Sequence, residues 1–299
     1  MSDSARSFEP HRRRLLGLAY RMLGSIAEAE DAVQETYLRW HTADRASVSD
    51  PRAFLMTTTT RICLDVLRSA RVRRETYVGP WLPEPVIDTG ALAPDAHTEL
   101  AEDLSIALLL TLDRLSPLER AAFLLHDVFD CSFTEVAAVL GRSESACRQL
   151  ATRARAHVRE ARPGPGVSTE ASSNSTSATH AQLLSAFLHA TTSGDLDGLT
   201  RLLARDVRVI TDGGGKVAAA LNVIKGAEPA ARFIVGATRK GLTGHETVRP
   251  APVNGLPGLI IEEAGRLIQT VAFEIEGGVI RAIYVVRNPD KLRHLSAAG

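Results

Sequence analysis

Apolar positions before residue 163 recur with the spacing of α-helices. The clearest stripe, at positions i, i+3, i+4 and i+7, consists of Leu15, Leu18, Ala19 and Met22. Three Ser-x-x-Glu sequences mark helix starts, because the two side chains of such a capping box bond to free N–H groups of the first turn. They are Ser25–Glu28, Ser116–Glu119 and Ser132–Glu135. This part of the chain is therefore predicted to be all-α.

The pattern changes after residue 180. We expect two short helices, at 180–193 and 195–204, followed by a strand at Val207–Thr211, a glycine turn and a helix near 227–239. Beyond that helix, the segments LIIEE, LIQTVAFEIE and VIRAIYVVRN are rich in β-branched residues or alternate in polarity. The pattern predicts an α+β domain with a curved antiparallel sheet.

Two stretches without either periodicity divide the chain. One contains the sequence WLPEP (Trp81–Pro85) and is predicted to be a connector. The other, PGPGVSTEASSNSTSAT, has the composition of a flexible linker. The expected organisation is a helical domain at 1–75, the connector at 76–98, a second helical domain at 99–162, the linker at 163–179 and the α+β domain at 180–299.

Composition narrows the function classes only slightly. The 35 Lys and Arg residues balance the 35 Asp and Glu residues, so total charge gives no sign of nucleic-acid binding and local charge must be examined. The three cysteines have no CxxC spacing, which predicts neither a metal site nor a disulfide framework and suits a reducing compartment. No apolar run approaches the roughly 20 residues that a membrane span needs. We expect a cytoplasmic protein without a cofactor or membrane contact.

The strongest local motif lies at residues 133–160. Phe133–Leu140 is predicted to be a helix that ends at Gly141, and Ser143 can cap a second, basic helix. This spacing is typical of a helix-turn-helix, whose second helix enters the major groove of DNA. The alternative is a helical hairpin with a solvated basic face. The candidate DNA-contacting residues are Ser143, Glu144, Arg148, Gln149 and Arg153.

Two further helical faces carry uneven charge. Residues 24–40 place acidic and amide side chains around Leu38, opposite an apolar face, and such a face is either solvated or complementary to a basic partner. Residues 51–74 form a basic stripe suited to a phosphate backbone and a melted strand. The acidic face contains Glu28, Asp31, Gln34 and Glu35, and the basic stripe contains Arg61, Arg68, Arg71, Arg73 and Arg74.

Two of these segments resemble a known family. AEDAVQETYLRW (residues 29–40) is similar to the polymerase-binding segment of sigma domain two, and Leu104–Glu160, with LDRLSPLERAAFLL ahead of the helix-turn-helix, is similar to sigma domain four. Their order and separation resemble extracytoplasmic-function (ECF) sigma factors of the sigma-70 family. The resemblance implies a regulator of transcription initiation that binds core RNA polymerase, recognises the −10 and −35 promoter elements and catalyses no reaction.

The same resemblance assigns roles to residues. It implies that Asp31, Gln34, Glu35 and Leu38 bind the clamp coiled coil of the polymerase β′ subunit. The basic stripe at 51–74 becomes the −10 segment, and domain four becomes the module that binds the β flap and the −35 element.

Residues 180–299 resemble the SnoaL-like, or NTF2-like, cone fold. The patches WLPEP, DGGGK and NPDKL match the ECF subgroup that is fused to such a domain. The resemblance implies that the fused domain regulates the sigma domains in cis, although DGGGK alone could equally be a hairpin turn. The residues expected to take part are Trp81, Leu82, Pro83, Asp212, Gly213, Gly214, Gly215, Lys216, Asn288, Pro289, Asp290 and Lys291.

Two other functions compete with this interpretation. One is a ligand-responsive helix-turn-helix repressor with a SnoaL-like sensor. The other is a SnoaL-like enzyme tethered to a DNA-binding module. Its available acids and bases form no recognisable constellation, so we expect a pocket that binds a small molecule or a protein rather than catalysis. Those residues are His189, Asp206, His245, Glu262 and Glu263. The promoter, the inducing signal, the ligand, the sign of the regulation and the oligomeric state do not follow from the sequence.

Overall fold

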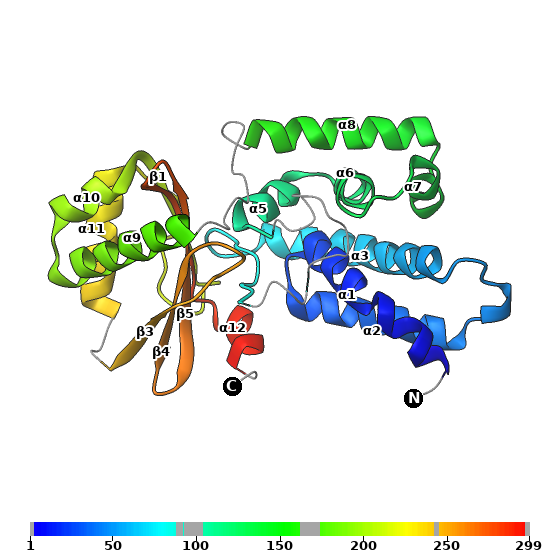
Figure 1. The fold of residues 1–299 in the computed structure, drawn as a ribbon, viewed down its shortest axis with the longest axis horizontal. Coiled ribbons are helices and arrows are strands. Elements are labelled where there is room, and N and C mark those ends of the chain that lie inside the picture. The colour runs from blue at the N-terminus through cyan, green and yellow to red at the C-terminus, as the bar shows by residue number, and fades with distance from the viewer. Residues whose placement is uncertain (1–2, 88–91, 93–103, 162–173, 242–244, 297–299) are drawn as a thin grey trace. The chain divides into compact units, whose positions relative to one another are not determined.

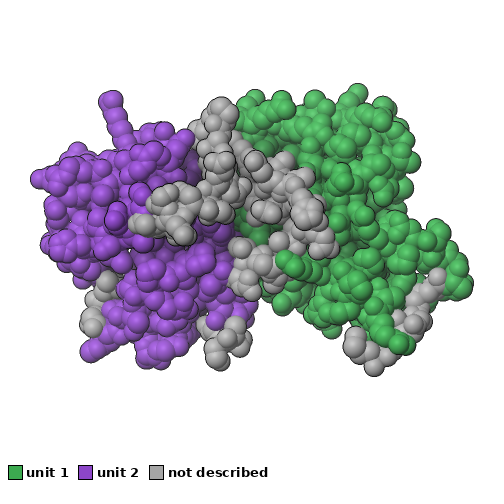
Figure 2. Space-filling model, viewed as in Figure 1, with its two compact units in different colours: residues 1–76, 89–165 green, residues 77–88, 166–299 purple. Residues whose placement is uncertain are grey.

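The computed structural model describes residues 3–87, 92, 104–161, 174–241 and 245–296. The chain divides into two compact units (Figure 2). The helical unit contains residues 1–76 and 89–165, and the C-terminal unit contains residues 77–88 and 166–299. Residues 77–88 of the connector thus belong to the same compact unit as the C-terminal sheet.

The first helical bundle is built from α1 (Asp3–Leu23), α2 (Ile26–Thr42) and α3 (Pro51–Glu75), with a short 3-10 turn at Arg45–Ser47. The expected stripe of α1 is buried, and Trp40 of α2 is buried beside it. Pro51 is well suited to the first position of α3, because the N–H that proline lacks would have no partner within the helix there. The carboxylate of Asp50 accepts from the Ala53 N–H at 3.1 Å and so caps the start of α3.

The second bundle consists of α5 (Ile106–Arg114), α6 (Pro117–Phe123), the five-residue π-helical turn η3 (Leu124–Val128), α7 (Phe133–Leu140) and α8 (Glu144–Ala161), as Figure 1 shows. Of the three predicted capping boxes, those at Ser116 and Ser132 are complete, and at the start of α2 the Ser25 hydroxyl accepts from the Glu28 N–H at 3.2 Å. Gly141 has φ 62°, the left-handed conformation expected after α7. The π-helical turn was not predicted.

The C-terminal unit is an α+β fold. Helices α9 (Asn174–Ser193), α10 (Leu196–Leu202) and α11 (Ala227–Gly241) contact one another. A last helix, α12 (Pro289–Ser296), contacts β5. The strands are β1 (Leu203–Asp212), β2 (Ile224–Lys225), β3 (Glu246–Pro250), β4 (Gly258–Glu263), β5 (Arg266–Glu276) and β6 (Val279–Val286).

The sheet has the strand order β2-β1-β6-β5-β4-β3. Strands β1 and β6 pair in parallel, while the other neighbours are antiparallel, so the sheet is mixed and the expectation of a purely antiparallel sheet is wrong. After β1 the chain passes through α11, β3, β4 and β5, and β6 then runs beside β1 in the same direction. Helix α9 also begins at Asn174 rather than near residue 180, where the linker was expected to end. Most of that linker lies outside the described residues.

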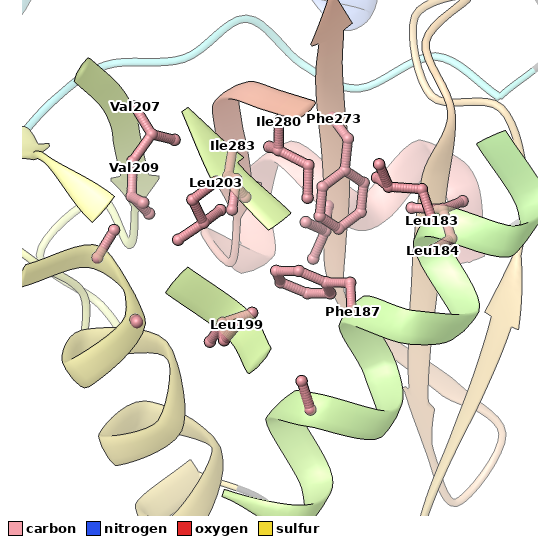
Figure 3. Close-up of a cluster of buried hydrophobic side chains, with 14 of the residues drawn as sticks. Leu183, Leu184, Phe187, Leu199, Leu203, Val207, Val209, Phe273, Ile280 and Ile283 are labelled. Atoms are coloured by element: carbon pink, nitrogen blue, oxygen red, sulfur yellow. The ribbon is translucent and has the colours of Figure 1, made fainter. Parts of the chain in front are cut away.

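Both faces of the sheet are covered. Side chains alternate between the two faces of a strand, so Val207 and Val209 of β1 point toward the helices while Asp212 lies on the opposite face. Figure 3 shows the helix side, where apolar residues from α9, α10, β1, β5 and β6 fill the space against the sheet. Phe187 and Phe273 meet there edge to face, with ring centroids 4.9 Å apart.

No described helix is long and apolar enough to cross a membrane.

Candidate functional site

The acidic face predicted on α2 is exposed, as the sequence indicated. Its opposite face is buried at Ala29, Val33 and Trp40. Leu38 leaves 51% of its surface exposed within this polar surrounding, and a solitary exposed leucine among acidic side chains suits a partner that offers both charge and an apolar contact. Asp31 and Gln34 are exposed, whereas Glu35 is half-buried and accepts from Arg39 at 2.9 Å.

Arginines of the basic stripe on α3 contact other protein groups in this structure. The guanidinium of Arg61 donates to the backbone carbonyls of Ala138 and Val139, at 3.3 Å each. These carbonyls belong to the last turn of α7, where a cation complements the helix dipole. Arg68 is exposed and pairs with Asp65 at 3.0 Å. The side chains of Arg71, Arg73 and Arg74, in the last turns of α3, lie outside the described part.

Other arginines also join the two helical bundles. The buried guanidinium of Arg120 on α6 donates to the Met22 carbonyl at the end of α1, at 2.5 Å, and to Asp113 at 3.1 Å. Burial lowers the pKa of Arg120 to about 10, which leaves it charged at neutral pH. Arg14 of α1 donates to the Phe129 carbonyl, and its guanidinium lies 5.3 Å from the Phe129 ring. The two helical bundles, to which the sequence assigns domains two and four, are therefore joined by cationic contacts, of which that of Arg120 is buried.

The start of α8 carries the five residues expected to contact the −35 element. Ser143 caps the helix, since its hydroxyl accepts from the Ala146 N–H at 3.3 Å. Arg148 and Glu144 form an ion pair at 3.0 Å, and Gln149 is exposed. Arg153 pairs with Glu119 of α6 at 3.0 Å, so it supports the packing of α8 as well as presenting charge.

The three signature patches meet around one buried carboxylate in the C-terminal unit. Asp212, at the end of β1, is fully buried. It accepts from the Tyr77 hydroxyl at 2.5 Å, from the Leu82 N–H at 2.8 Å and from the Lys291 ammonium at 2.7 Å. The DGGGK turn supplies the carboxylate itself, and the connector and the NPDKL helix start supply its partners. We call this group, Tyr77, Trp81, Leu82, Asp212 and Lys291, the connector site.

Lys291 is bound in the connector site by more than its ion pair. Its ammonium lies 4.3 Å from the centroid of the Trp81 ring and 5.0 Å from that of Tyr77, and it also donates to the Leu82 carbonyl. A desolvated cation over aromatic faces gains more from them than an exposed one. Burial and the hydrogen bond to Asp212 raise the pKa of Tyr77, which stays a neutral donor. The site is thus a saturated network around one buried ion pair.

Glycine is required where the DGGGK turn passes the connector. Gly214 has φ 58°, and a Cβ there would lie 2.2 Å from the Asn288 side-chain nitrogen, which donates to the Tyr77 hydroxyl at 2.9 Å. Gly215 has φ 71°, and its Cβ would meet Val78 at 3.1 Å. The turn is therefore more than a hairpin connection, because its close backbone approach makes room for the connector.

A second anchor holds the end of the described connector. Asn254 donates its N–H to the Val86 carbonyl at 2.7 Å and accepts from the Val86 N–H at 3.1 Å. The His294 ring bonds to the Pro85 carbonyl at 2.8 Å. Sequence reasoning missed Tyr77, Asn254 and His294, although the dipeptide Asn254-Gly255 is a turn signal and Asn254 has the left-handed φ of 52°.

The remaining acids and bases of the C-terminal unit do not converge. Asp206 pairs with Arg281 at 3.4 Å and Glu262 pairs with Arg249 at 3.6 Å. Among the described residues no group of three His, Cys, Asp or Glu side chains could hold a metal ion. An open groove of about 710 Å³ lies between α9 and residues 250–258.

Known proteins resemble this chain in both helical domains and over most of its length. The family model described as Sigma-70 region 2 matches residues 8–73, and Sigma-70, region 4 matches residues 105–158. The ECF RNA polymerase sigma factor SigJ of Mycobacterium tuberculosis is 41% identical over 95% of this chain and 91% of its own. A probable ECF sigma factor, SigI, from the same species is 34% identical over 97% and 95%. The crystal structure of SigJ has a TM-score of 0.71 and covers 96% of this chain and 98% of its own.

Proposed function

Because this chain belongs to the ECF sigma factors of the sigma-70 family, we propose that its SnoaL-like C-terminal unit regulates promoter binding by holding the connector between its two sigma domains. The chain is a sigma factor and not an enzyme: it binds core RNA polymerase and promoter DNA, and it directs transcription initiation. The repressor alternative is not favoured, since the relatives that are similar over nearly the whole chain are sigma factors.

The acidic face of α2 is proposed as the surface that binds the clamp coiled coil of β′. Its support is the exposure of Asp31, Gln34 and Leu38 on one side of a helix whose other side is buried. Domain four is proposed to bind the β flap. The first turns of α8, with Arg148 and Gln149 exposed, are proposed to read the −35 element, and the basic stripe of α3 the −10 element.

The packing within the helical unit supports a restrained state. The −10 and −35 elements lie apart on the promoter, and each base pair adds about 3.4 Å of duplex length. Domains that bind both elements must therefore separate, which requires the bonds of Arg61 to α7 and of Arg120 to Met22 to break. The connector runs between the two domains, so its fixation at Asp212 limits how far they can move apart.

The small-molecule ligand expected for the C-terminal unit stays a prediction. The groove between α9 and residues 250–258 is a candidate place for it. The same loop holds Val86 through Asn254, so a ligand there would act on the connector's second anchor. Thermal stabilisation of the full-length chain by a ligand, lost in an Asn254→Ala variant together with its transcriptional effect, would support this link.

The decisive experiment compares the full-length chain with a form truncated at Pro163. Both forms are tested for binding to core RNA polymerase and for transcription from discrete promoters. Binding of both forms to core supports the α2 assignment, and Leu38→Ala should weaken it in both. A difference in transcription between the forms gives the sign of the C-terminal effect. Equal transcription by the two forms would contradict the proposed regulation.

A further inference from the structure

The role proposed for α8 in base recognition does not explain how the Arg148 side chain is oriented before DNA binds. We propose that Phe133 is a positioning residue that holds the Arg148 guanidinium over its ring, with Thr134 and Glu144 fixing the other side of the same group. This inference rests on the proposed function of α8 as the −35 reader. It adds a specificity determinant on α7, the helix that precedes the recognition helix.

The contacts converge on Arg148 from two helices. Its guanidinium carbon lies 5.0 Å from the centroid of the Phe133 ring, and its Nη2 donates to Glu144 Oε2 at 3.0 Å. The Thr134 hydroxyl donates to the other oxygen, Glu144 Oε1, at 2.8 Å. Glu144 therefore joins α7 to Arg148 through both carboxylate oxygens. The Thr134 and Arg148 bonds lower the pKa of Glu144, which keeps it ionised at neutral pH.

The Phe133 ring is itself held in place. The His126 ring stacks on it, with centroids 3.9 Å apart and an interplanar angle of 27°. His126 Nδ1 is bonded to the Cys131 carbonyl at 2.8 Å, which fixes the imidazole. His126 lies in the π-helical turn η3, so this irregular turn provides the surface against which Phe133 rests. Single π turns within helices are often found at functional sites.

These contacts bear on the role proposed for Glu144. Glu144 is one of the residues expected to contact bases, but both of its oxygens already bind Thr134 and Arg148. We therefore assign Glu144 a supporting role. Arg148 has five donors, of which Glu144 uses one, so a fork remains for a guanine edge. The orientation of that fork is set by the Phe133 ring.

The test uses holoenzyme formed from the full-length chain and core polymerase, which selects bound DNA from a library randomised across the upstream promoter element. Arg148→Lys should lower the preference at one base position about fivefold or more. Phe133→Leu should lower the preference at the same position about two- to fivefold, because a cation–π contact at an exposed site corresponds to that factor. Phe133→Tyr should restore it, and Thr134→Val should lower it without altering the ring.

Each outcome decides a different point. If Arg148→Lys changes no base preference, the reading role of Arg148 fails and the positioning role fails with it. If Arg148→Lys relaxes one position while Phe133→Leu and Thr134→Val leave it unchanged, only the positioning inference is overturned. A uniform loss of binding by Phe133→Leu across all positions, with Thr134→Val like the wild type, would make Phe133 merely structural. Loss of preference at a different position in Glu144→Gln would return Glu144 to base reading.

Discussion

Replacing Lys291 by methionine is a sharp test of the connector site. Methionine retains much of the apolar stem beside Trp81, but it removes the ammonium group that lies 2.7 Å from Asp212. Asp212 is then a fully buried carboxylate without a counter-charge. It keeps two donors, the Tyr77 hydroxyl and the Leu82 N–H.

The expected loss follows from these contacts. Removing one partner of a buried ion pair costs about 3–5 kcal/mol, because the remaining charge stays desolvated. The two remaining donors stabilise Asp212, which places the loss near the lower end, at about 3 kcal/mol. Asp212→Asn combined with Lys291→Met should recover part of it, since the buried charge is then absent. The matched control is Lys216→Met, which breaks an exposed pair with Asp290 and should cost less than about 1 kcal/mol.

The chain offers a direct assay because it contains two tryptophans, one in each unit. Labelling with 5-fluorotryptophan gives a fluorine resonance for Trp40 in the helical unit and another for Trp81 in the C-terminal unit. Urea titration followed by fluorine NMR then measures the two units separately. Lys291→Met should move the Trp81 transition to lower urea. If Lys291→Met and Lys216→Met shift that transition equally, the buried ion pair does not stabilise the connector site.

Two further predictions concern the helical unit. Arg120→Met removes the charged hydrogen bond to the Met22 carbonyl, which stabilises the packed bundles by about 2 kcal/mol. The population of molecules with separated bundles should therefore rise about thirtyfold. Spin labels on α2 and α8 should report longer distances, and an unchanged distance distribution would contradict this prediction. Hydrogen bonds from Ser132 lower the pKa of Glu135 in the folded protein. The ionised Glu135 therefore stabilises α7 fully above its unfolded pKa of about 4.3, and this stabilisation is lost as the pH falls through its lower folded pKa. The melting-temperature difference between wild type and Ser132→Ala should therefore shrink below pH 4, and a constant difference would exclude the ionised cap.

Local signals predicted the helix-turn-helix well. Its first helix, its left-handed Gly141 and its Ser132 cap follow from residues within a few positions of one another. The connector site shows where such reasoning stops. The motifs WLPEP, DGGGK and NPDKL were identified by resemblance, but the partnership of Tyr77 with Asp212 joins residues 135 positions apart. Nothing local in the sequence distinguishes Tyr77 from an ordinary loop tyrosine.

The sheet and the arginine contacts were missed for related reasons. Strand periodicity gives the face of each residue but not the direction of its neighbour, so the parallel pairing of β1 with β6 could not be read from the pattern. Arg61 was assigned to DNA from its place in a basic stripe, whereas its bonds to Ala138 and Val139 depend on how two bundles pack. Its role at the promoter stays a prediction.

Lys291 follows both sigma domains in the chain, and this order has a consequence during synthesis. Leu82 and Lys291 are 209 residues apart, and a ribosome adds roughly 5–20 residues per second. From residue 162, where the second sigma domain ends, 129 residues remain to Lys291, so the complete sigma domains emerge about 6–26 s before the connector can contact Lys291. Throughout that interval the connector of each nascent chain lacks its contacts with Lys291, and a product terminated before residue 291 never acquires them. The order of synthesis thus gives the protein its sigma domains before it completes the proposed restraint.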